Sequence, residues 1–184
     1  MKSLRNQSVQ PASVPLMADD ILEFHAARVL LLLAICGTNG AISGLTKMAK
    51  LDFFVRYPDF FLAAAAGDKR VGAPREHKAS VEAAMVRHHY GPWDKRYYHI
   101  LAFLEAYGLI TIRKSGRSIR LALTKLGKSR VERLGGMSAF LKLRSHMEQV
   151  GRAFSAKTGN ELKTLIYQMF DEEIRRKPLG YVIG

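Results

Sequence analysis

Apolar residues in the first third of the chain follow spacings that predict three helices. Residues 21–36 are apolar on most faces, which predicts a central buried helix. A second helix is predicted after Ser43, a candidate N-cap, and it should end near Tyr57 because Pro58 disfavours helical backbone in the residue before it. A short third helix is expected over residues 59–66.

The middle of the chain combines a loop with the most regular helical pattern in the sequence. Residues 67–79 contain two glycines and a proline without apolar periodicity, which predicts an inserted basic loop, and a short helix is expected over residues 80–87. Asp94 is the candidate N-cap of a longer helix, and Gly108 is expected to end it. The stripe of this helix that should face the core consists of Tyr97, Ile100, Leu101 and Leu104.

A β-hairpin followed by helices is predicted in the second half of the chain. Residues 109–112 and 119–123 have the composition and alternation of strands, and Thr124 is expected to cap the next helix. Residues 140–154 carry apolar side chains at spacings of three and four, and Thr158 begins a capping box for a final helix. The chain is therefore expected to end in a helical hairpin with apolar faces.

The order of these elements predicts a winged helix, in which the third helix enters a major groove and the hairpin contacts the DNA backbone. The predicted fold class is mainly α (α+β), with a two-stranded wing and a C-terminal helical hairpin. A flexible tail is expected over residues 1–18, the winged-helix domain over 19–136 with the basic loop near 67–79, and the helical hairpin over 137–184. Such an order indicates a fold more specifically than a function.

Charge is concentrated on the predicted hairpin and the helix after it. The 184 residues carry 29 Lys and Arg against 16 Asp and Glu, and this net charge of +13 favours polyanionic partners such as nucleic acid. Residues 99–136 hold eight basic and two acidic side chains, and therefore 8 − 2 = +6 of that excess. The cations predicted to contact DNA phosphates are Arg113, Lys114, Arg117, Arg120, Lys125, Lys128 and Arg130, with Arg133 beside them.

Base readout is predicted at the start of the helix after Asp94, where long polar side chains could reach base edges. The residues concerned are Lys95, Arg96, Tyr98 and His99. A basic surface also serves as a solvated face or as a docking surface for an acidic protein, and several winged-helix modules do not touch DNA. DNA contact is the favoured interpretation because the cations are localised on the hairpin.

Two groups of apolar residues are candidates for binding a protein partner. Trp93 and Tyr98 are either exposed anchors of the kind that dominate interfaces or parts of the core. The second group is a narrow stripe of apolar residues, here called the seam, that either packs on the final helix or holds a partner or a second copy. The seam consists of Phe140, Leu143, Met147, Val150 and Phe154.

No arrangement of residues in this sequence indicates catalysis. It contains no phosphate loop, dinucleotide fingerprint or nucleophile elbow, and Cys36, the single cysteine, lies inside the apolar first helix, where it reads as a small hydrophobe. The histidines lack carboxylates or thiols at ligand spacing, so no metal and no cofactor are expected. One cysteine and no apolar run long enough to span a bilayer predict a cytoplasmic location.

Two segments carry a resemblance to a known family. Leu51 to Pro58 (LDFFVRYP) and Arg87 to Tyr98 (RHHYGPWDKRYY) resemble the small middle-component proteins of bacterial ABC-three-component systems, which include the small subunit of Lamassu-type defence systems. The resemblance spans about residues 21–134, and the string Tyr-Gly-Pro-Trp-Asp is its most specific part. The N-terminal tail and the basic loop lie outside it.

This resemblance implies a non-catalytic accessory subunit that binds no nucleotide. Such a subunit would bridge an SMC-like ATPase and an effector, often a nuclease, in defence against phage or plasmids. The alternative is a free-standing winged-helix transcription regulator that dimerises through the C-terminal hairpin. A regulator should prefer an inverted-repeat site, whereas a subunit should bind DNA weakly and without sequence preference.

Overall fold

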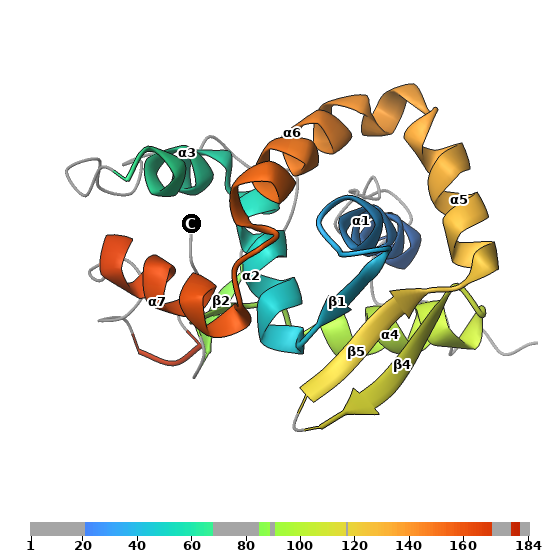
Figure 1. Cartoon of the computed structure of the whole chain (residues 1–184), viewed down its shortest axis with the longest axis horizontal. Coiled ribbons are helices and arrows are strands. Elements are labelled where there is room, and N and C mark those ends of the chain that lie inside the picture. Colours follow the sequence, from blue (N-terminus) through green and yellow to red (C-terminus); the bar gives the residue numbers. More distant parts are fainter. Residues whose placement is uncertain (1–20, 68–84, 89–90, 117, 171–177, 181–184) are drawn as a thin grey trace, which may run out of the picture.

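The computed structural model describes residues 21–67, 85–88, 91–116, 118–170 and 178–180 (Figure 1). The helices in these ranges are α1 (Leu22–Ile35), α2 (Leu45–Arg56), α3 (Pro58–Ala66), α4 (Tyr97–Ala106), α5 (Lys125–Gly135), α6 (Ser138–Phe154) and α7 (Gly159–Met169). The strands are β1 (Ala41–Ser43), β2 (Val86–His88), β3 (Gly91–Trp93), β4 (Ile110–Ser115) and β5 (Ser118–Leu123). The predicted mainly α, α+β class is confirmed. The predicted tail and, beyond Gly67, the predicted basic loop lie outside the described residues.

A three-stranded antiparallel sheet in the order β1-β5-β4 includes a strand that the sequence did not reveal. Ser43 belongs to β1 and pairs with Arg120, so the prediction that it caps α2 is wrong. The residue before α2 is Gly44, which has a φ of +97° and no side chain to cap the helix. A strand of three residues that pairs with a distant part of the chain leaves no local periodicity to detect.

The helix predicted over residues 80–87 is also wrong where the structure describes it, because Val86–His88 is strand β2. It pairs antiparallel with β3, and Pro92 lies opposite Arg87. Gly91 adopts a φ of +91°, and a side chain there would lie against the end of Lys50. Lys50 Nζ donates a hydrogen bond of 2.7 Å to the carbonyl oxygen of Pro92. This short hairpin is therefore anchored on α2.

The helix, hairpin and helix predicted from Tyr97 onward are confirmed. The prediction that Asp94 caps the first of these helices is wrong, because Arg96 is the residue before α4. The predicted stripe of α4 is buried, and Gly108, at a φ of +66°, follows the end of the helix. Thr124 accepts a hydrogen bond from the backbone nitrogen of Gly127 at 3.0 Å and donates one to the Gly108 carbonyl at 2.7 Å. A Cβ on Gly127 would lie 2.0 Å from the Leu109 carbonyl oxygen, so only glycine lets α5 approach the start of β4 this closely.

Helices α6 and α7 complete one core with α1, α2 and α3. Figure 1 shows α5 and α6 arching around α1, while α7 lies beside α2. Phe154 of α6 packs against Phe54 of α2 with ring centroids 4.7 Å apart, and Phe170 packs against Phe60 of α3 at 4.6 Å. Burial of both C-terminal helices against α2 means that they do not form the separate helical hairpin that was predicted. The capping box at Thr158 is confirmed.

Candidate nucleic-acid interface

The β4–β5 hairpin presents its cations to solvent. Lys114 is exposed near the turn of the hairpin. Arg113 and Arg120 are exposed on one face of the sheet, whereas Ile110 and Leu121 on the opposite face are buried in the core. Alternation along a strand sends neighbouring side chains to opposite faces, which explains this division. The turn end of the hairpin extends beyond the helices at the lower edge of Figure 1. Arg117, also predicted to contact DNA, lies outside the described residues.

Helix α5 continues this basic surface. Its half-buried Val131 and Leu134 pack against the core. Because these apolar residues fix the inner side of the helix, its polar side chains point outward. The exposed cations of α5 are Lys125, Lys128, Arg130 and Arg133.

The cations of the hairpin and α5 are not neutralised by the part of the chain that the structure describes. Ion pairs occur there between Arg28 and Asp52, at Asp94, and between Arg144 and Glu148, but none involves a cation of β4, β5 or α5. Arg113 lies directly opposite Arg120 in the sheet register. Like charges opposite each other destabilise a strand pair, so this arrangement favours an anion bound between them.

The start of α4 fits base readout less well than the sequence indicated. Lys95, Tyr98 and His99 are exposed, as that role requires. Arg96, by contrast, donates through Nη2 to Asp94 Oδ2 at 2.7 Å and through Nε to Asp94 Oδ1 at 3.0 Å. Because this double hydrogen bond fixes the guanidinium against the protein, the prediction that Arg96 reads bases is corrected.

Arg96 instead stabilises the corner between β3 and α4. Asp94 also accepts a hydrogen bond from Arg56 at 2.8 Å. Burial acts to raise the pKa of Asp94, but the hydrogen bonds from Arg96 and the charges of Arg56 and Arg96 outweigh burial and lower the pKa to about 2. The carboxylate is therefore ionised at neutral pH and holds both arginines in place.

The outer face of α4 has a carboxylate near its C-terminal end. Glu105 Oε1 accepts a hydrogen bond of 2.9 Å from the backbone nitrogen of Ile112. This bond ties α4 to β4 and leaves a negative charge on the surface of the helix. Ala102 is also exposed on α4 and offers no polar atom for a base edge.

The predicted partner-binding residues belong mostly to the core. Trp93 is 6% exposed and packs edge-on against Tyr97, with ring centroids 5.4 Å apart, so it is not a surface anchor. Tyr98 is 62% exposed and remains accessible to a partner.

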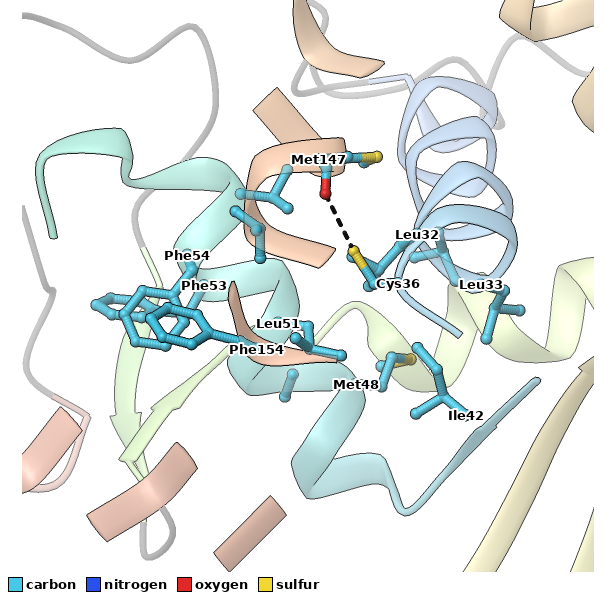
Figure 2. Packing of buried hydrophobic residues seen from close by; sticks show 14 of the residues in the cluster. Leu32, Leu33, Cys36, Ile42, Met48, Leu51, Phe53, Phe54, Met147 and Phe154 are labelled. Atoms are coloured by element: carbon cyan, nitrogen blue, oxygen red, sulfur yellow. Dashed lines mark hydrogen bonds between the residues drawn. The ribbon is translucent and has the colours of Figure 1, made fainter. Parts of the chain in front are cut away.

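The seam of α6 is likewise buried within the chain. The prediction that Phe140, Met147, Val150 and Phe154 bind a partner is corrected, because these four side chains fill the space between α6 and helices α1, α2 and α3. Figure 2 shows Phe154 against Phe54 and Met147 facing the end of α1. Leu143 is half-buried and lines a surface cavity of about 620 Å³, so it is the accessible member of the seam.

Cys36 sits at the end of α1 and points at α6 (Figure 2). Its thiol donates to the carbonyl oxygen of Met147 at 3.4 Å. Burial and the charge of Asp52 raise the pKa of Cys36 to about 12. The thiol is therefore protonated at neutral pH and is a poor nucleophile.

Sequence reasoning missed a buried polar network that joins α1, α2 and α4. Arg28 and Asp52 are fully buried and form two hydrogen bonds, at 2.9 and 3.3 Å. Tyr97 donates to Asp52 Oδ2 at 2.7 Å. Burial, followed by the charge of Asp52, raises the pKa of Tyr97 well above its ordinary value. The available signal was a charged residue inside each of two apolar helical runs, since a buried charge requires a partner.

His25 connects this network to the β3–α4 corner. Its Nδ1 lies 2.9 Å from Arg28 Nη1, and its Nε2 lies 2.9 Å from Arg96 Nη1. The network therefore fixes α4 relative to α1 through a continuous set of polar contacts.

Other kinds of site find no support in the described residues. These residues include no group of three metal-binding side chains and no helix with the length and hydrophobicity needed to span a bilayer. Comparison with protein-family models, curated proteins and solved structures finds no match to this chain.

Proposed function

We propose that this chain is a DNA-binding protein of the winged-helix class. The element order supports this proposal: α1, β1 and α2 precede α4, and the β4–β5 hairpin and α5 follow it, with β1 pairing on β5. A winged helix has this order, and its hairpin is the wing that contacts the DNA backbone. Helix α3 and the β2–β3 hairpin are then insertions between α2 and α4.

The observation that carries the proposal is the set of exposed cations on β4, β5 and α5 that pair with no described carboxylate. Cations on a wing bind phosphates, which supplies affinity without sequence information. Fixation of Arg96 by Asp94 removes one side chain from base readout. We therefore propose contact with duplex DNA that is largely independent of sequence.

More particularly, we propose an accessory subunit of an SMC-like ATPase defence complex, of the ABC-three-component or Lamassu type. The two segments that resemble this family meet in the structure: Arg56 bonds to Asp94, and Tyr97 bonds to Asp52. A pair of segments joined by buried polar bonds is one structural unit, which supports treating them as a single family feature. In this role the chain would bridge the ATPase and an effector nuclease without catalysing a reaction.

A free-standing dimeric regulator is the weaker alternative. Such a regulator would dimerise through the C-terminal hairpin, and four of the five seam residues of this hairpin are buried within this chain. It also required base readout at the start of α4, where Arg96 is held by Asp94.

Replacing Arg113 and Arg120 together with alanine is expected to weaken binding to all duplexes equally. Each phosphate contact contributes about 0.9 to the slope of log K against log salt, so the double variant should lower that slope by about 1.8. Fluorescence anisotropy with two duplexes of unrelated sequence, over a series of salt concentrations, measures both quantities.

The matched control for this experiment replaces Lys142 and Arg152, which are exposed on α6, with alanine. This control removes the same charge from a different surface, and its salt slope should equal that of the wild type. Equal slopes for the Arg113 and Arg120 variant and the wild type would contradict a role of the wing in DNA binding.

A further inference from the structure

We propose that the outer face of the three-stranded sheet is the track on which one sugar–phosphate strand of DNA lies. This inference rests on the proposed function and adds Ser43 of β1 to the binding residues. The track is the row of Ser43, Arg120 and Arg113, one residue from each strand.

The sheet register places these three side chains in one line. Ser43 pairs with Arg120, and Arg120 pairs with Arg113. Residues directly opposite in an antiparallel sheet point to the same face, and neighbouring strands are about 4.8 Å apart. One hydroxyl and two guanidinium groups therefore cross the sheet at right angles to the strands, and all three residues are exposed.

Small side chains flank this row on the same face. Ala41 pairs with Ala122, and Ala122 pairs with Thr111, two residues along each strand from the row. Ala41 is buried, whereas Ala122 and Thr111 are half-buried, so the accessible part of the outer face is the row of Ser43, Arg120 and Arg113. The opposite face, with Ile42 and Leu121, is packed into the core, so a ligand has access from the outer side alone.

The charges of the row favour a polyanion. Arg113 and Arg120 face each other without an ion pair to a described residue, and a phosphate between them would relieve their repulsion. A guanidinium offers a planar pair of donors that matches two phosphate oxygens. The Ser43 hydroxyl adds a neutral donor of the kind that commonly contacts the DNA backbone.

The neighbouring acidic group does not compete for these arginines. Glu105 accepts the hydrogen bond of the Ile112 backbone nitrogen, and Ile112 points to the inner side of the sheet. The row is therefore open to a phosphodiester strand, and it reads no bases. A DNA strand on this track crosses β1, which extends the contact beyond the β4–β5 hairpin.

Replacing Ser43 with aspartate tests the track. A carboxylate in the row would repel phosphate and pair with Arg120, so affinity for unrelated duplexes should fall by about tenfold, together with the salt slope. Ser145→Asp, at an exposed position of α6, adds the same charge elsewhere and should bind closer to the wild type. The Tm of both variants is measured alongside. If S43D lowers the Tm, S43A is used in its place and should show a smaller loss of DNA affinity.

The outcomes separate the track from the proposed function. The track is overturned if Ser43→Asp and Ser43→Ala bind DNA as tightly as Ser145→Asp does. If replacement of Arg113 and Arg120 still weakens binding in that case, DNA binding by the wing stays in place. Absence of duplex binding by the wild-type chain would overturn both. A loss of binding to an acidic protein, with DNA binding unchanged in Ser43→Asp, would also overturn the track.

Discussion

Asp52→Ala is expected to lower the free energy of unfolding by about 3–5 kcal/mol, because it leaves the fully buried Arg28 without its carboxylate. Tyr97 also loses its hydrogen-bond acceptor in this variant. Urea unfolding followed by circular dichroism measures the change. Such a loss is a large share of the 5–15 kcal/mol that stabilises a typical domain, so the Tm of the variant should fall by about 6–20 °C.

Two further variants separate the ion pair from the hydrogen bond. Tyr97→Phe removes one hydroxyl that bonds to Asp52 and should cost about 1 kcal/mol. Arg28→Met combined with Asp52→Leu removes both buried charges and should cost less than the sum of the single changes. Additive effects of Arg28→Met and Asp52→Leu would show that the two residues do not stabilise each other.

Lys50→Met is expected to change how stability depends on pH. Lys50 is fully buried, and burial, followed by the charge of Lys163, lowers its pKa from 10.5 to about 7. Between these values the unfolded chain holds a proton that the folded chain has released, so the free energy of unfolding rises with pH. Below about pH 7 both states are protonated, and the cost of burying the charge is present in full.

Methionine has no charge, so the variant lacks this pH dependence. Relative to the wild type, K50M should be most stable below pH 7 and lose this advantage by about 1.4 kcal/mol per pH unit toward higher pH. Methionine also lacks the hydrogen bond to Pro92, which lowers the free energy of unfolding of K50M by the same amount at every pH. Lys142→Met, on the surface of α6, controls for loss of a lysine. If the difference in free energy of unfolding between K50M and the wild type stays constant from about pH 7 to 10.5, Lys50 keeps its proton in the folded state.

Local signals were sufficient to predict α4, the β4–β5 hairpin, α5 and the capping box of α7. Each of these features depends on residues close together in the chain, such as Thr124 with Gly127 or Thr158 with Glu161. Strands β1, β2 and β3 were missed because three-residue strands have no detectable period. The position of β1 depends on pairing with β5, which lies far away in the sequence.

The sequence predicted correctly that the charged residues of the candidate site are exposed, but it did not predict that most of the apolar candidates are buried. The cations of β4, β5 and α5 were expected on the surface, and those that the structure describes are exposed. The seam of α6 has the spacing of an interface helix. Spacing alone does not show whether such a face contacts another protein or the same chain, and here α2 packs against it. Arg96 was misassigned for the same reason, since its guanidinium contacts His25, which lies far away in the sequence. Trp93 was misassigned although its ring contact, Tyr97, is close to it in the chain.

The most direct test of the proposed function is purification of the tagged full-length chain after expression with its neighbouring genes. Mass spectrometry identifies the proteins that are recovered, and light scattering gives the stoichiometry. The proposal predicts recovery of a large coiled-coil ATPase in a fixed ratio to this chain. Recovery of a homodimer of this chain alone would contradict the role of accessory subunit and favour a regulator.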